Sequence, residues 1–355
     1  LETITFAKQL SGFGVRSFYN CTSLTKINIP DSVTVIPQQA FYQCTSLNSI
    51  WLPDSVTTVE EEAFKLCRSA ATIRLSNQLA SIGQGAFYGC ESFAGKQQFT
   101  PSGSSTPIAT TLLILPETLT FIGDSAFEAC TKLDGVKFPE HLNAIGSNAF
   151  QNCSSLSQAI LPNDLQHFGK AVFAGCTSLT EVSIPHDISR IAVNTFDGCT
   201  ALQTVHLPAG TELIADSAFN GCTALQRVEY KGTVGDWYNV QIEDHNEVLY
   251  TTPIFCSNGD TFGHKTTHGT LSNGMKWIFN SDATLTISGT GPMVDFELDA
   301  TDDTVVVPWE DVKYNISHVV YEEGITTTGD FVFYHCPNLT SVTLPDTMTE
   351  IGNST

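Results

Sequence analysis

The residues in this 355-residue chain that most strongly suggest chemistry are its eleven cysteines. They stand at Cys21, Cys44, Cys67, Cys90, Cys130, Cys153, Cys176, Cys199, Cys222, Cys256 and Cys336. The first four and the next five are spaced 23 residues apart, and the 40-residue gap between these groups equals one period plus a 17-residue insertion. An odd count and a uniform spacing argue against disulfides, and isolated cysteines lack the close C-x-x-C pairs of a zinc site. We therefore predict that the repeated cysteines are small buried residues that pack in the interior.

Two other clusters contain residue types that bind metals. Cys256, His264 and His268 follow the spacing C-x7-H-x3-H, which can wrap a zinc ion but lacks a second cysteine. The acidic run ELDATDD lacks the glycine and the final glutamate of an EF-hand loop. Its carboxylates are Glu297, Asp299, Asp302 and Asp303. We interpret both clusters as solvated loops and predict no metal and no cofactor, with a zinc site as the alternative for the first.

The composition restricts the classes of function. The sequence has no G-x-S-x-G, H-E-x-x-H, P-loop or G-x-G-x-x-G motif, so we predict that the protein is not an enzyme. A net charge of -21 and a pI of about 4.6 disfavour nucleic acid and anionic lipid as partners. No apolar run approaches the roughly 18 residues of a membrane span. Because the chain begins at Leu1 without a methionine, we expect a mature or partial sequence in which any signal peptide or anchor is not visible.

The residues around each periodic cysteine repeat with the same period. A phenylalanine stands three residues before each of them, from Phe18 to Phe219, and the shared pattern is AFxxCxxLxxVxLPxxLxxIG. The alternating L-x-x-V-x-L part ends at a proline and predicts a short strand, whereas AFxxC predicts a short helix or 3₁₀ turn. One strand and one short helical segment per repeat of about 20–29 residues is typical of the leucine-rich-repeat unit. Such a unit buries its apolar face only by stacking on its neighbours.

The expected fold class is an α/β solenoid, a right-handed leucine-rich-repeat superhelix interrupted by a small all-β module. Residues 1–230 form the first array, with a loop insertion at about 94–110 that is rich in Ser, Thr, Pro and Gly. Residues 231–313 lose the period, and their segment WIFNSDATLTISGTGPMVDF predicts a hairpin, so we interpret them as a β-rich cap and spacer. Residues 314–355 begin a second, incomplete array. We interpret the insertion as a tolerated surface loop, with a binding loop as the alternative.

The repeat resembles the BspA-like leucine-rich-repeat family of bacterial cell-surface proteins, the 23-residue type also found in Treponema. The segments IGQGAFYGC (Ile82 to Cys90) and CTSLTEVSIP (Cys176 to Pro185) are similar to the unit of that family. The likeness covers about residues 1–230 and 314–355. It implies an extracellular or cell-surface location and a role in adhesion, with matrix proteins or host glycoproteins as partners.

A binding surface is predicted on the outward side of the strands. Side chains alternate along a strand, so the residues between the apolar positions line the concave face, with which solenoids of this kind bind partners. The candidate ligand-binding residues are Trp51, Arg74, Lys137, Ile160, Glu181, His206 and Arg227. Trp51 and Ile160 stand out because each places a large apolar group where water is expected.

The sequence therefore predicts a non-enzymatic cell-surface or secreted repeat protein. It would bind a host or microbial surface macromolecule, either a protein or a glycan, through the concave face. The alternative is a passive structural spacer that displays another domain from the cell surface. We also expect a monomer, no nucleic-acid partner and no membrane insertion in this part of the chain.

Overall fold

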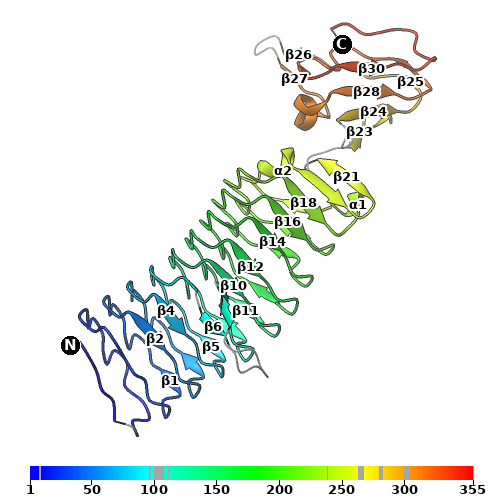
Figure 1. Ribbon diagram of the computed structural model, residues 1–355. Coiled ribbons are helices and arrows are strands. Elements are labelled where there is room, and N and C mark those ends of the chain that lie inside the picture. The colour runs from blue at the N-terminus through cyan, green and yellow to red at the C-terminus, as the bar shows by residue number, and fades with distance from the viewer. Residues whose placement is uncertain are drawn as a thin grey trace. The chain divides into compact units, whose positions relative to one another are not determined.

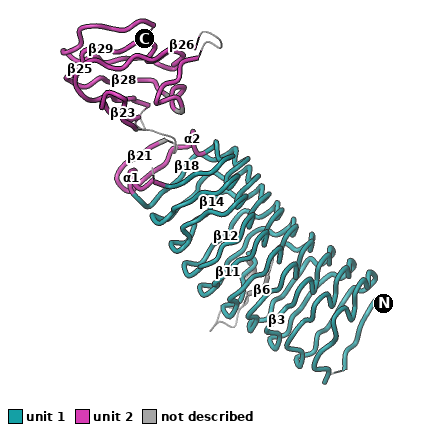
Figure 2. The backbone as a smooth tube through the Cα atoms, turned by 180° about the vertical axis from the view of Figure 1, so that it is seen from behind, with its two compact units in different colours: residues 1–232, 240–248 teal, residues 233–239, 249–355 magenta. Residues whose placement is uncertain are grey.

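In the computed structural model, residues 1–232 form a solenoid of short stacked strands (Figure 1). The structure describes residues 1–7, 9–95, 97–99, 108–110, 112–237, 239–262, 268–279, 283–299 and 304–354. Unit 1 comprises residues 1–232 and 240–248, and unit 2 comprises residues 233–239 and 249–355 (Figure 2). The three-part division made from the sequence stays a prediction.

One side of unit 1 is formed by strands that carry the L-x-x-V-x-L pattern. These are β2 (Ser49–Trp51), β4 (Thr72–Arg74), β8 (Leu112–Ile114), β10 (Gly135–Lys137), β12 (Gln158–Ile160), β14 (Glu181–Ser183), β16 (Thr204–Leu207) and β18 (Arg227–Tyr230). β2 pairs with β4, and β8 to β18 form consecutive parallel pairs. Val136 lies opposite Ala159, one period away, so the repeat length sets the register. In β12 and β14 the central residue is buried and the two flanking residues are exposed, as expected from the alternation of side chains along a strand.

A second row of two-residue strands follows the prolines. It contains β1 (Val35–Ile36), β3 (Thr58–Val59), β5 (Ser81–Ile82), β9 (Phe121–Ile122), β11 (Ala144–Ile145) and β13 (His167–Phe168), then β15 (Arg190–Ile191), β17 (Leu213–Ile214) and β19 (Gln241–Ile242). All of their pairings are parallel. Ser81 lies opposite Phe121 although they are 40 residues apart, so the insertion leaves the stacking of the coils intact.

The insertion predicted as a surface loop contains two paired strands. β6 (Gln97–Phe99) and β7 (Ile108–Thr110) run antiparallel, with Gln98 opposite Ala109. Residues 100–107, the Ser- and Pro-rich part of the predicted loop, lie outside the described residues. Whether the insertion is a binding loop therefore stays open.

The AFxxC segments are successive turns, so the short helix predicted for each repeat is not confirmed. In the coil at Gln39–Cys44, Gln39 and Gln43 adopt positive φ angles of 55° and 56°. The amides of Gln39, Phe41 and Gln43 donate to carbonyls of the next coil at 2.8–2.9 Å, and the amides between them bond three residues back. A helix would satisfy these groups within one segment, whereas here half of them join neighbouring coils. Among the described residues, helical segments are limited to α1 (Val234–Trp237), α2 (Val248–Thr251) and η1 (Glu310–Asn315).

The interior of unit 1 is a stack of identical layers. The phenylalanine rings from Phe18 to Phe219 form a continuous column with centroid separations of 5.1–6.0 Å. The cysteines from Cys44 to Cys222 are buried and free, which confirms the packing prediction for them; Cys21 is partly exposed. Each buried thiol donates to the carbonyl of the phenylalanine in the preceding coil, at 3.1–3.5 Å. The cysteine thus fills a small space and gives a second hydrogen bond to a carbonyl that already accepts the backbone amide of the cysteine in its own coil.

Unit 2 contains several antiparallel pairs of strands and a short parallel array. β20 (Pro253–Cys256) pairs with β21 (Gly259–Phe262). β22 (His268–Thr270), β23 (Lys276–Phe279) and β24 (Thr284–Ser288) form an antiparallel meander, which confirms the hairpin predicted around WIFNSDATLTIS. β24 then pairs in parallel with β28 (His318–Tyr321), and β28 with β30 (Ser341–Thr343). The remaining strands are β25 (Gly291–Pro292) with β29 (Ile325–Thr327), and β26 (Leu298–Asp299) with β27 (Thr304–Val305).

Candidate binding surface

The outward side chains of the L-x-x-V-x-L strands in unit 1 form a surface that we call the strand face. All seven predicted site residues lie on these strands. Trp51, Arg74, Lys137, Ile160 and His206 occupy the same position of their repeats, and Glu181 and Arg227 occupy the outward position two residues earlier. Trp51 is 59% exposed and Ile160 is 49% exposed, so both present apolar surface to water. Binding by these residues stays a prediction.

Arg74 is held in place by neighbouring groups of its own face. Its guanidinium donates to the carbonyl of Leu52 at 2.8 Å and pairs with the carboxylate of Asp54 at 3.1 Å. Asp54 also accepts from the amide of Asn77 at 3.1 Å. Arg74 lies opposite Trp51 in the β2–β4 pair. The indole therefore has a positioned, charge-compensated guanidinium beside it.

The last strands of the face carry a closed group of polar contacts. His206 Nε2 lies 2.8 Å from a carboxylate oxygen of Glu181, and its Nδ1 lies 3.5 Å from Glu229. Arg227 Nε pairs with Glu229 at 2.6 Å. Glu181 thus contacts His206 directly, and Glu229 links His206 to Arg227. Partly exposed pairs of this kind contribute little to stability, but they occupy the groups that a ligand would need.

Two apolar residues of the strand face were missed in the sequence. Leu112 and Ile114 lie on β8 and are half-buried, in register with Gly135 and Lys137 of β10. The insertion hid their place in the repeat. Counting back 18 residues from Cys130, which gives the strand start in other repeats, identifies Leu112. The proline after Leu115, as in the L-P of other repeats, is a second signal for this strand.

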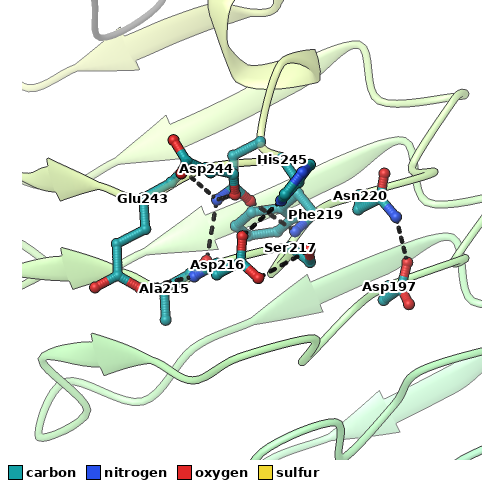
Figure 3. A network of polar contacts seen from close by, with 10 residues as sticks. Asp197, Ala215, Asp216, Ser217, Phe219, Asn220, Glu243, Asp244 and His245 are labelled. Carbon is teal, nitrogen blue, oxygen red and sulfur yellow. Dashed lines mark hydrogen bonds and ion pairs between the residues drawn. The ribbon is translucent and has the colours of Figure 1, made fainter.

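The last coil of unit 1 is closed by a polar network that the sequence did not reveal (Figure 3). Asn246 is fully buried, and its Oδ1 accepts from the amide of Phe219 at 2.9 Å. In the other coils a backbone carbonyl of the next repeat accepts this bond. The Asn246 amide group also donates to the carbonyls of Ala215, Glu243 and Asp244. Its side chain therefore replaces a missing layer and satisfies backbone groups that would otherwise be orphaned.

His245 and Asp216 form an ion pair at the exposed edge of this network. The Nδ1 of His245 lies 2.7 Å from Asp216, as Figure 3 shows. This hydrogen bond is the main cause that raises the pKa of His245, and the charges of Asp216, Glu247 and Asp244 add to it. The amide of Asp216 is in turn bound by the carboxylate of Glu243 at 2.9 Å.

The cysteine thiols are poorly suited to nucleophilic chemistry. Burial raises the pKa of Cys44, Cys90, Cys153 and Cys222 to about 12, and it also raises the pKa values of the thiols between them. A thiol must ionise to act as a nucleophile or metal ligand. The buried cysteines from Cys44 to Cys222 are therefore better suited to packing than to nucleophilic chemistry.

The metal hypothesis falls largely outside the described residues. His264, Asp302, Asp303 and the side chain of His268 lie outside the part of the chain that the structure describes. Within the described segments, no group of three His, Cys, Asp or Glu side chains has the geometry to hold a metal ion. Among the same residues, no helix has the length and apolarity needed to cross a membrane.

Fold and surface together define a leucine-rich-repeat solenoid with a mixed polar and apolar strand face. A family model described as "BspA type Leucine rich repeat region" matches six copies over residues 1–96, 106–226 and 312–355. These ranges cover more than half of the chain, which therefore belongs to this family. No curated protein matches the chain.

Several solved structures are similar to the chain. A leucine-rich repeat protein from Bacteroides ovatus is 21% identical, with 96% of this chain and 77% of that chain covered and a TM-score of 0.47. The T. pallidum leucine rich repeat protein is 27% identical, with 54% and 72% covered and a TM-score of 0.37. A leucine rich cell surface protein from Faecalibacterium prausnitzii is 26% identical, with 64% and 78% covered and a TM-score of 0.29.

Proposed function

We propose that this chain is a non-enzymatic, secreted or cell-surface repeat protein that binds a host or microbial surface macromolecule through its strand face. Its membership of the BspA-type family supports this role. The pKa values of the periodic thiols, raised by burial, favour a structural over a catalytic use of these residues.

The exposed indole of Trp51 is the observation that carries the proposal. An isolated apolar group on a surface is ordinary, but a 59% exposed tryptophan on a positioned strand is typical of residues that dominate binding energy. The neighbouring Arg74 is already oriented by Leu52 and Asp54, so a partner would not have to order it. Trp51 and Arg74 together offer a flat ring and a cation at one place.

A passive spacer remains the second candidate, and the contacts of His206 favour it. Glu181, His206, Arg227 and Glu229 satisfy one another on the last strands of the face. A partner that used them would first have to separate these pairs. A spacer needs only such a solvated, self-satisfied surface.

The test is a binding array of matrix proteins, glycoproteins and glycans probed with three forms of the protein. These are the wild type, Trp51→Ala, and Phe121→Ala as the matched control, since Phe121 is a 45% exposed aromatic on β9, in the other row of strands. We expect Trp51→Ala to weaken binding to the wild-type hits by about tenfold or more, the loss typical of a hot-spot residue. Phe121→Ala should leave the hits unchanged.

Two results would contradict the binding role. If the wild type bound no probe, the spacer would be favoured. If Trp51→Ala, and a variant with further strand-face substitutions, bound every hit as the wild type does, binding would have to lie elsewhere on the molecule.

A further inference from the structure

The middle of the strand face carries an apolar patch with one lysine at its centre. Leu112 and Ile114 lie on β8, Lys137 on β10 and Ile160 on β12; we call these four residues the Lys137 patch. Ile114, Lys137 and Ile160 are direct cross-strand neighbours. The lysine therefore lies between two aliphatic side chains.

Gly135 allows the fourth residue to lie flat across the sheet. A Cβ atom at position 135 would come within 2.3 Å of Leu112 Cδ2, so the leucine occupies the space above the glycine. Leu112 and Gly135 are also register partners. The patch is thus a continuous aliphatic surface over two strands, extended to β12 by Ile160.

Lys137 differs from the other cations of the strand face. Arg74 pairs with Asp54, and Arg227 pairs with Glu229. Among the described residues, no carboxylate forms an ion pair with the exposed Lys137. The outward positions of β8, β10 and β12 hold no acidic residue at all, although the chain carries a net charge of -21. The patch is a local cationic and aliphatic site on a polyanion.

We propose that the Lys137 patch binds an extended protein segment in which an aspartate or glutamate is flanked by aliphatic side chains. This inference rests on the proposed function, because it assigns a partner chemistry to the same face. The carboxylate pairs with Lys137, and the flanking aliphatic groups cover Leu112, Ile114 and Ile160. An extended segment fits because its side chains alternate with a spacing close to that of the strands beneath it.

The chemistry of the patch disfavours other ligand classes. Sugars are bound by aromatic faces and dense hydrogen bonding, whereas three of the four patch side chains are aliphatic. Anionic lipid would be repelled by the surrounding negative charge. The same charge repels acidic proteins at long range, so the pair with Lys137 acts only on contact. Added salt screens the repulsion more than it screens a partly desolvated pair.

The experiment uses the whole chain and two synthetic nine-residue peptides, in which Gly and Ser flank either Ile-Asp-Ile or Ile-Lys-Ile. Surface plasmon resonance measures the binding of both peptides from 20 to 150 mM salt. We expect the wild type to bind the acidic peptide about tenfold more tightly than the basic one at 150 mM, a factor that one partly buried charge pair supplies. Affinity for the acidic peptide should not fall as salt rises.

Three variants complete the design. Lys137→Glu should reverse the peptide preference. Lys170→Glu is the control, because it makes the same charge change at an exposed lysine away from the strand face. Gly135→Ala should lower the affinity for the acidic peptide severalfold while retaining the preference, because the new methyl group displaces only the end of Leu112.

The outcome also separates this inference from the proposed function. If neither peptide bound, or if Lys137→Glu and Lys170→Glu shifted the preference equally, the Lys137 patch would not be an acidic-segment site. Array hits that depend on Trp51 would still stand in that case. If the array gave no Trp51-dependent hit but Lys137→Glu reversed the peptide preference, the Lys137 patch would bind acidic segments although the proposed binding through Trp51 had failed.

Discussion

The two units of this chain build similar parallel coils around different interiors. Unit 1 stacks one phenylalanine per coil and, from Cys44 to Cys222, one buried cysteine per coil, with a spacing of 23 residues everywhere except across the insertion. The interior of unit 2 is built around Trp277 and Trp309, whose rings meet edge to face with centroids 5.8 Å apart. Methionine and tyrosine side chains pack in the same core. In its parallel pair β24–β28, Thr284 lies opposite His318, which is 34 residues further along the chain.

The difference shows how coil length selects the interior residues. Apart from the insertion, which leaves the stacking intact, the coils of unit 1 have the same length. Each layer therefore meets an identical layer, and a small residue in one coil fits the small residue of the next. When coil lengths differ, the layers no longer match, and large side chains fill the irregular space. Unit 1 therefore depends on thiols in every layer, and unit 2 depends on a few large residues.

Alkaline pH should produce the largest difference in stability between the two units. The pKa of Cys153 is raised to about 12 in the folded chain, whereas an unfolded cysteine titrates near 8.5. The buried thiols thus stabilise the fold fully below about pH 8.5, and this contribution is lost as the pH rises toward the folded value. Each pH unit in this window favours unfolding by about 1.4 kcal/mol per buried thiol. We expect unit 1 to unfold before unit 2 between about pH 9 and 11.

Hydrogen exchange measured by mass spectrometry shows in which unit the backbone amides lose their protection first. Unit 2 holds Cys256 and Cys336, both only partly buried, so it has fewer thiols of this kind among the described residues. Iodoacetamide labelling at pH 8 gives a second readout, in which Cys21 and Cys336 should react before Cys153. Unit 2 unfolding first, or rapid labelling of Cys153, would show that the thiols are not buried as described.

Trp309→Ala should produce the second-largest effect, confined to unit 2. The indole is fully buried, contacts Trp277, Phe296 and Phe333, and donates to the carbonyl of Val332 at 3.3 Å. Removing such a side chain costs about 3–5 kcal/mol, because the cavity does not collapse. Calorimetry should show one transition shifted to lower temperature, with the unit 1 transition unchanged. An equal shift of both transitions would mean that the units do not unfold separately.

The sequence revealed the regular part of the fold because repetition multiplies weak signals. One AFxxC or L-x-x-V-x-L segment is ambiguous, but the same positions recur from Phe18 to Phe219. The turn geometry was harder to foresee. A segment with left-handed residues such as Gln39 and Gln43 has no strong propensity signature, and its hydrogen bonds reach another coil. Local pattern alone therefore suggested a helix.

The candidate site was only partly accessible from the sequence. The alternation of strand residues identified Trp51 and Ile160 as outward and apolar, and both are exposed. Whether a charged residue is paired depends on its neighbours in space: Arg74 pairs with Asp54 of the preceding coil, and Arg227 pairs with Glu229 two residues along its own strand. The sequence did not show that Lys137 differs from them. Asn246 gave no signal, because its role exists only where the periodic layers stop.

Gly146→Ala tests how tightly the coils of unit 1 approach one another. A Cβ atom on Gly146 would lie 2.5 Å from the backbone nitrogen of Asp124 and 2.6 Å from the carbonyl carbon of Gly123. The two coils would have to separate, at a cost of about 1–3 kcal/mol. Ala192 occupies the same repeat position two coils later, so Ala192→Gly is the matched control and should have a smaller effect. Urea unfolding measures the stability of both variants. Equal losses of stability would mean that the close approach of the coils at Gly146 does not determine the cost of the substitution.

The smallest effect is expected at the end of unit 1, where the polar network of Asn246 closes the last coil. Pairing with Asp216 raises the pKa of His245 above its ordinary value near 6.5, and Glu247 and Asp244 act in the same direction. The stabilisation is therefore complete below about pH 6.5 and is lost as the pH rises through the raised value. His245→Asn should destabilise unit 1 slightly at pH 5.5 and not at pH 8.5, and Asp216→Asn should abolish that pH dependence. Thermal unfolding of both variants at the two pH values decides this, and a His245→Asn effect that is equal at both would show that the charge on His245 does not stabilise the last coil.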